Sequence, residues 1–321
     1  MPFWRSHSDH ARYVDMWMFP NLHPTNIDLL QRLKSADDRQ FGTNMDVVGT
    51  VSEYVPKQRG WVVSHQIGLR TDIWHPDAQE RARSLARLKT LRRQQLQAEI
   101  RRSGRLSAAE RNALEAKLEA DSVSQMTIGD IEQRRLVLKH FRSTGTRIRW
   151  TGTIEELTSW EVANSLAANR PLLSLAVNLA GRDAFTIFQQ HSRRVRYPAV
   201  YGFCHFDEQS RRMWNITVKR RWISIGADFD VLADGKRIGM IDGNLIGFGY
   251  NAYVDIKDPV LGQDSRLMDM LSMFASSVGY HWGIWKSLRR RMQSIRQGRH
   301  VEHVIDSEEL RLLTAPRRRA A

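Results

Sequence analysis

The sequence predicts an α+β protein in which an antiparallel β-barrel surrounds a C-terminal apolar helix, preceded by a helical hairpin and an extended N-terminal arm. Three observations support this fold class. Residues 172–256 form short runs of strand-like alternation separated by turn residues, residues 264–297 repeat apolar side chains at helical spacing, and residues 77–141 have helical patterning. The 321 residues suffice for one large domain or two.

The first predicted unit is a tryptophan-rich arm over residues 1–76. Thr25 caps a short helix over residues 26–34, and residues 47–55 and 61–67 alternate enough to form strands. Because exposed tryptophans are unfavourable in water, we expect this arm to lie against the rest of the chain or against a partner.

The second predicted unit is a basic helical segment over residues 77–141, which has two helices as a hairpin and a third after residue 127. Gly104 ends the first helix, and Ser107 with Glu110 forms a capping box that starts the second. The first helix carries arginine and lysine on nearly all faces, so burial in a core contributes little to its stability.

Charge is distributed unevenly along the chain, whose net charge is +14 and whose pI is near 10.4. Residues 81–149 hold 17 basic and 7 acidic residues, and residues 286–321 hold 10 and 4, whereas residues 150–285 are neutral. This bias favours an acidic partner, although a solvated helix face is the alternative. The predicted polyanion-binding residues are Arg92, Arg93, Arg101, Arg102, Arg317, Arg318 and Arg319.

The third predicted unit is the barrel with its helix, residues 142–298, followed by a basic tail over residues 299–321. Asp234-Gly235 and Asp242-Gly243 are typical of hairpin turns, and Thr158 with Glu161 matches a second capping box.

The final helix, residues 264–297, is apolar on all faces in its first half, which is typical of burial in a core or a membrane. Only residues 270–285 lack charged side chains, and this length spans about 24 Å, less than the roughly 30 Å of a bilayer core. We therefore favour a core helix with Phe274, Val278 and Trp285 buried. The alternative is a membrane span, for which Trp282, Trp285 and residues 289–291 would be the interfacial anchor.

The run from Val218 to Gly235, with the following strand 237–241 and turn 242–244, resembles the tubby-like, LURP-one-related and phospholipid-scramblase-like domains over residues 172–296. The resemblance implies a barrel around a helix and places a Lys-x-Arg pair at Lys219 and Arg221, where tubby proteins hold a phosphoinositide head group. Alternate strand residues face one side, so both cations could grip one phosphate. Ile223 stands where tubby proteins carry an asparagine.

Catalytic signatures are missing from the sequence. Gly247–Ala252 matches a dinucleotide-binding pattern, but it precedes strand-like residues rather than a helix. The single cysteine, Cys204, excludes an intrachain disulfide, and we expect it to be packed. No metal-ligand set or nucleophile motif appears, so we predict no enzyme activity, no cofactor and no metal.

The sequence thus predicts a non-catalytic subunit of a large intracellular assembly, with the mitochondrion as one option, whose basic extensions hold RNA, partner subunits or acidic membrane. The first residues do not match a secretory signal, which agrees with an intracellular location. The alternative is a peripheral membrane protein that binds anionic lipid through Lys219 and Arg221.

Overall fold

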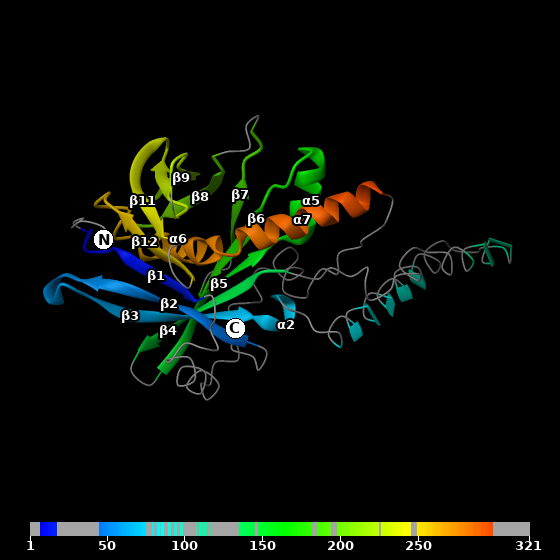
Figure 1. Ribbon diagram of the computed structural model, residues 1–321, viewed down its shortest axis with the longest axis horizontal. Helices are drawn as coiled ribbons and strands as arrows, with labels where there is room; N and C mark the ends of the chain where they lie inside the picture. The colour runs from blue at the N-terminus through cyan, green and yellow to red at the C-terminus, as the bar shows by residue number, and fades with distance from the viewer. Residues whose placement is uncertain are drawn as a thin grey trace.

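The computed structural model describes residues 7–17, 45–74, 135–144, 147–181, 185–193, 198–224, 226–244 and 249–297, with isolated positions between 79 and 116. Over these residues, twelve antiparallel strands form one closed barrel (Figure 1). The strands are β1 (Arg12–Trp17), β2 (Met45–Val55), β3 (Gly60–Arg70), β4 (Val137–Thr144), β5 (Arg147–Glu156), β6 (Ser174–Leu179), β7 (Phe185–Gln190), β8 (Val200–Asp207), β9 (Arg212–Arg220), β10 (Phe229–Ala233), β11 (Lys236–Asn244) and β12 (Gly249–Ile256). The helices are η2 (Pro56–Gln58), α2 (Thr71–Trp74), α5 (Thr158–Ala167), α6 (Ser265–Val278) and α7 (His281–Arg296).

The first strand closes the barrel. Arg12 of β1 pairs with Val254 of β12 on one side and with Glu53 of β2 on the other. Val14 and Met16 alternate with less buried residues and enter the core, as expected for a half-buried strand.

The predicted fold class is therefore wrong at its N-terminal end. Residues 12–17 and 45–70 do not form an extended arm, because they supply β1, β2 and β3 of the barrel itself. The strands expected over 47–55 and 61–67 are confirmed as β2 and β3, whose pairing partners do not follow from local patterning. The helix expected over 26–34 lies outside the described residues.

The basic helical segment is described only in part. Isolated positions such as Arg93 are helical, and the Ser107–Glu110 capping box is present, with Glu110 N donating to Ser107 Oγ over 3.3 Å. The third helix was expected to reach residue 141, but residues 137–141 belong to β4 and pair with β3 and β5. Leu138 and Phe141 are buried there, so tertiary packing overrides the helical pattern.

The C-terminal helix also differs from the prediction. Residues 264–297 form two helices that follow the barrel in the chain, in place of one central helix enclosed by strands 172–256. The break falls at Gly279 and Tyr280, where a side chain on Gly279 would crowd Cβ of Tyr250. In Figure 1, α7 runs on from α6 toward α5. The repeat of apolar residues continues across the break because each helix buries its own stripe.

The first of these helices, α6, supplies much of the core. It contacts β1, β4, β5, β6 and β12, and Phe274 is fully buried. The Phe274 ring stacks on Phe188 at 5.4 Å and meets Tyr201 edge-on at 5.0 Å. Val278 is buried as expected, whereas Trp285 on α7 is only half-buried.

Of the two predicted hairpin turns and the second predicted capping box, one turn is confirmed. Asp234 and Gly235 have positive φ and join β10 to β11, which confirms that hairpin turn. Asp242 and Gly243 instead lie within β11. The second capping box is also wrong, because Leu157 is the N-cap of α5 and makes no side-chain cap hydrogen bond.

In the part of the chain that the structure describes, none of the helices combines the length and apolar character that a membrane crossing requires.

Candidate functional site

The predicted Lys-x-Arg pair lies on the outer surface of the barrel, at the end of β9. Lys219 is exposed and stands opposite Asp230 of β10 in the strand register. Arg221 follows the last residue of β9 and is half-buried. The structure therefore places both residues on one sheet face, as alternate strand positions require.

Arg221 is already engaged by acidic neighbours. Its Nε and Nη2 donate to Asp230 Oδ1 at 3.0 and 2.7 Å, and Nε of Arg237 reaches the same oxygen at 3.0 Å. The hydrogen bond to Asp230 raises the pKa of Arg221, and the charges of Asp230, Asp228 and Asp242 add to this shift. A phosphate would have to displace or share these carboxylates, so the pair is a poor anion clamp.

Among the predicted polyanion-binding residues, the structure describes Arg93, which is helical and exposed. The others lie outside the described residues: Arg92, Arg101, Arg102, Arg317, Arg318 and Arg319.

A second basic surface lies on α7, and we call it the α7 face: Trp282, Lys286, Arg289, Arg290, Gln293 and Arg296. All six residues are exposed, and the helix sequence contains no Asp or Glu. Trp282 is 69% exposed and stacks on Trp285 with ring centroids 5.4 Å apart, and Arg289 lies over the Trp285 ring. The helix thus presents stacked indoles followed by cations, on a sequence without Asp or Glu.

Buried contacts fix α7 to the barrel. Nη1 of Arg291 donates to Glu156 Oε1 over 3.0 Å, and both side chains are almost fully buried. The other oxygen of Glu156 accepts the backbone N–H of Leu136 at 3.0 Å. Leu288 and Met292 pack against Val162 of α5. The α7 face is therefore held at a defined place on the barrel end.

A third carboxyl group joins this ion pair. Glu161 of α5 accepts a hydrogen bond from the backbone N–H of Ser174 at 2.7 Å. Burial raises the pKa of Glu161 well above its ordinary value, and the charge and hydrogen bonding of Glu156 raise it further. A protonated Glu161 leaves Glu156 as the anion that Arg291 neutralises.

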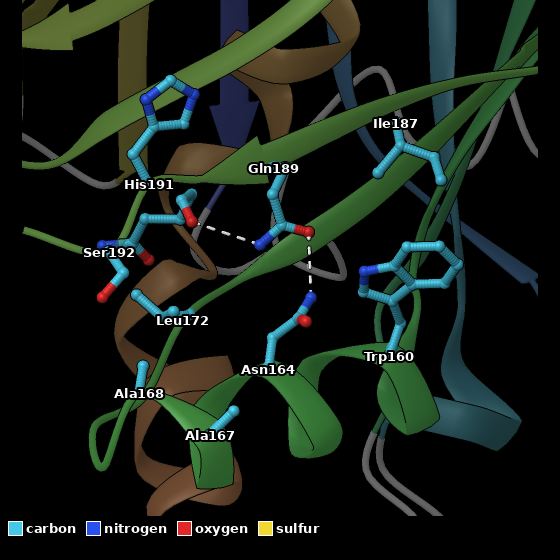
Figure 2. A pocket seen from close by; sticks show the side chains of 10 residues that line it. Trp160, Asn164, Ala167, Ala168, Leu172, Ile187, Gln189, His191 and Ser192 are labelled. Carbon is cyan, nitrogen blue, oxygen red and sulfur yellow. Dashed lines mark hydrogen bonds between the residues drawn. The ribbon is translucent and has the colours of Figure 1, made fainter.

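An open depression of about 830 Å³ lies between α5 and β7 (Figure 2). Trp160, Ala167 and Ile187 give it apolar walls. Its amides are bonded to one another: Asn164 Nδ2 donates to Gln189 Oε1 at 3.2 Å, and Gln189 Nε2 donates to the backbone carbonyl of Gln190 (Figure 2). The described lining contains no carboxylate or cysteine, and His191 is its one titratable side chain.

Serine–histidine pairs occur in the core, which could suggest nucleophilic chemistry. His140 contacts Ser276 at 3.1 Å, and His281 contacts Ser277 at 3.0 Å. Burial, with a smaller contribution from the charge of a nearby arginine, lowers the pKa of each of these two histidines to about 3. Both serine hydroxyls donate to carbonyls of α6 at 2.7 Å. These pairs are neutral groups that satisfy each other inside the protein.

The remaining candidate residues are separated. Cys204 is exposed on the outer face of β8, so the expectation that it is packed is wrong. His205 points inward, and its Nε2 lies 2.7 Å from Asp264 Oδ2. Burial raises the pKa of Asp264, but the hydrogen bond and charge of His205 outweigh that effect and lower it to about 2. Across the described ranges, no group of three or more His, Cys, Asp or Glu residues could hold a metal ion.

Comparison with known proteins adds no relative: no family model, no curated protein and no solved structure matches this chain.

Proposed function

We propose that this chain is a non-catalytic binding subunit of a larger intracellular assembly, which holds an acidic partner against its basic surfaces. The single observation that carries the proposal is the α7 face, where Lys286, Arg289 and Arg296 are exposed on a helix whose sequence contains no Asp or Glu. Like charges held close together repel one another, and an acidic partner relieves this repulsion.

The attachment of α7 supports a binding role. The buried Arg291–Glu156 pair fixes the orientation of the helix before any partner arrives. A surface that is ordered in advance loses less conformational entropy on association than a surface that orders on binding.

The described depression supports binding rather than catalysis. Ser192, a hydroxyl in its lining, accepts a hydrogen bond from Arg170 at 2.9 Å and has no described hydrogen bond to the neighbouring His191. A nucleophilic serine requires a base within hydrogen-bond reach.

The alternative, a phosphoinositide-like site at Lys219 and Arg221, remains a proposal from the tubby-like resemblance. Lys219 is exposed as that site requires, but Arg221 is bound to Asp230. We therefore favour the α7 face as the anion-binding surface.

Elution of the full chain from immobilised heparin in a salt gradient tests the proposal. The variant Lys286→Glu/Arg289→Glu should elute at lower salt, because reversed charges remove attraction to the polyanion. Lys57→Glu/Lys236→Glu is the matched control, since both lysines are exposed at the opposite end of the barrel, Lys57 in η2 and Lys236 at the start of β11. Equal elution of the two variants would overturn the proposal.

A further inference from the structure

One end of the barrel carries both exposed apolar side chains and cations. At this end, β9 ends and β10 begins, and the connection between them exposes Trp222 by 66% and Ile223 by 93%. Lys219, Arg220 and Arg221 precede them directly. An aliphatic side chain that is almost completely exposed beside a tryptophan has an energetic cost in water, and a partner that covers both removes it.

The start of α7 lies at the same end. Tyr201 of β8 and His281 of α7 are in contact, with 3.4 Å between the hydroxyl and Nδ1. The positive charge of Arg220 contributes to the lowered pKa of His281. Tyr250 links the same region, because its hydroxyl donates to Ala227 O at 3.4 Å and its Cβ lies against Gly279. The exposed residues Trp222 and Ile223, which we call the apolar tip, and the stacked Trp282–Trp285 pair therefore lie at the same end of the barrel.

From this arrangement we propose that this end of the barrel docks on an anionic lipid bilayer, with Trp222, Ile223 and Trp282 at the interface and the cations of the α7 face toward the lipid head groups. The proposal rests on the proposed function, because it names the acidic partner of the α7 face. Tryptophan is favoured at the boundary between head groups and acyl chains, and lysine or arginine is attracted to anionic lipid.

The apolar tip distinguishes a bilayer from RNA. RNA phosphates would attract the cations, and an RNA base could stack on a tryptophan. RNA has no apolar interior like that of a bilayer to accept Ile223. A bilayer accommodates aliphatic side chains, tryptophans and cations together. The strength of binding to it depends on the apolar area buried and on electrostatic attraction.

Flotation of the full chain with vesicles tests the proposal. We expect binding to vesicles of phosphatidylcholine with phosphatidylserine, and much weaker binding to phosphatidylcholine alone. Ile223→Asp should lower the partition coefficient by about tenfold or more, because it replaces an exposed aliphatic side chain that the bilayer would bury with a negative charge. Trp222→Ala should lower it in the same direction.

The control for the apolar tip is Met213→Asp, which changes an apolar residue that is 58% exposed at the opposite end of β9. It should bind vesicles like the parent. The control for charge compares Lys286→Glu with Lys236→Glu, of which only the first should weaken vesicle binding. Circular dichroism of each variant confirms that the fold is retained.

The outcomes separate this proposal from the proposed function. If Ile223→Asp and Trp222→Ala bind anionic vesicles as well as Met213→Asp does, docking through this end is refuted. If the chain binds polyuridylate but no vesicle, and Lys286→Glu weakens that binding, the partner is RNA: the bilayer proposal fails and the proposed function stands. If Lys286→Glu changes neither vesicle nor polyuridylate binding, both fail.

Discussion

Removal of the buried cation Arg291 should destabilise the protein and release α7. Arg291 and Glu156 have side chains that are 2% and 0% exposed and an Nη1–Oε1 distance of 3.0 Å. Arg291→Met leaves the Glu156 carboxylate buried beside Glu161 without a cation, and breaking a buried pair in this way costs about 3–5 kcal/mol. That loss is a large part of the roughly 5–15 kcal/mol that stabilises a typical domain.

Denaturant unfolding followed by circular dichroism measures this loss, and hydrogen exchange locates it. Amides in the second half of α7 should lose protection before those of the β-strands, because this half is attached through the Arg291–Glu156 pair and the packing of Leu288 and Met292 on α5. The double variant Arg291→Met/Glu156→Gln removes both charges and should recover much of the stability. The control Arg142→Met breaks the exposed pair with Glu53 and should cost at most about 1 kcal/mol. A cost for Arg291→Met no larger than that of the control would refute the reasoning.

Three further predictions concern the core, pH and charge. Phe274→Ala should lower the free energy of unfolding by about 3–5 kcal/mol in denaturant titrations, whereas the exposed Phe206→Ala should have little effect. The raised pKa of Glu161 means that the folded state holds a proton that the unfolded state releases, so stability falls as pH rises from 4.5 through the folded pKa. Glu161→Gln should therefore gain stability over the parent on going from acidic to alkaline pH, and parallel curves for the two proteins would contradict this. Charge reversal of the basic helical segment at Arg92, Arg93, Arg101 and Arg102 should lower heparin affinity more than charge reversal of Lys219 and Arg221. The reverse order would favour the phosphoinositide-like site at Lys219 and Arg221.

Local patterning predicted the strands well, and long-range pairing limited the prediction of the fold. Alternation of apolar residues located β2, β3 and most strands between residues 174 and 256. That alternation does not specify which strand lies beside which, so the pairing of Arg12 with Val254 was not predictable. The break at Gly279 was missed because an apolar repeat is equally compatible with one helix or two.

In the candidate site, too, local geometry was predictable from the sequence and long-range contacts were not. The sequence indicated that Lys219 and Arg221 face one side, because strand geometry is local. It could not indicate that Asp230 binds both Arg221 and Arg237, since these contacts depend on the register of β9, β10 and β11. The α7 face was visible as a run of tryptophan and arginine, but its exposure depends on which side of the helix meets α5.

Closure of the barrel by its first strand has a consequence for how the protein is made. Residues 12–17 are synthesised more than two hundred residues before their pairing partner at residues 249–254. Until then β1 forms one unpaired edge of the growing sheet and the most recently added strand forms the other. Unpaired strand edges are prone to association with other chains. Contacts so distant in sequence also slow folding. We therefore expect nascent chains that end before β12 to require chaperones, whereas chains that extend beyond α6 fold to the closed form.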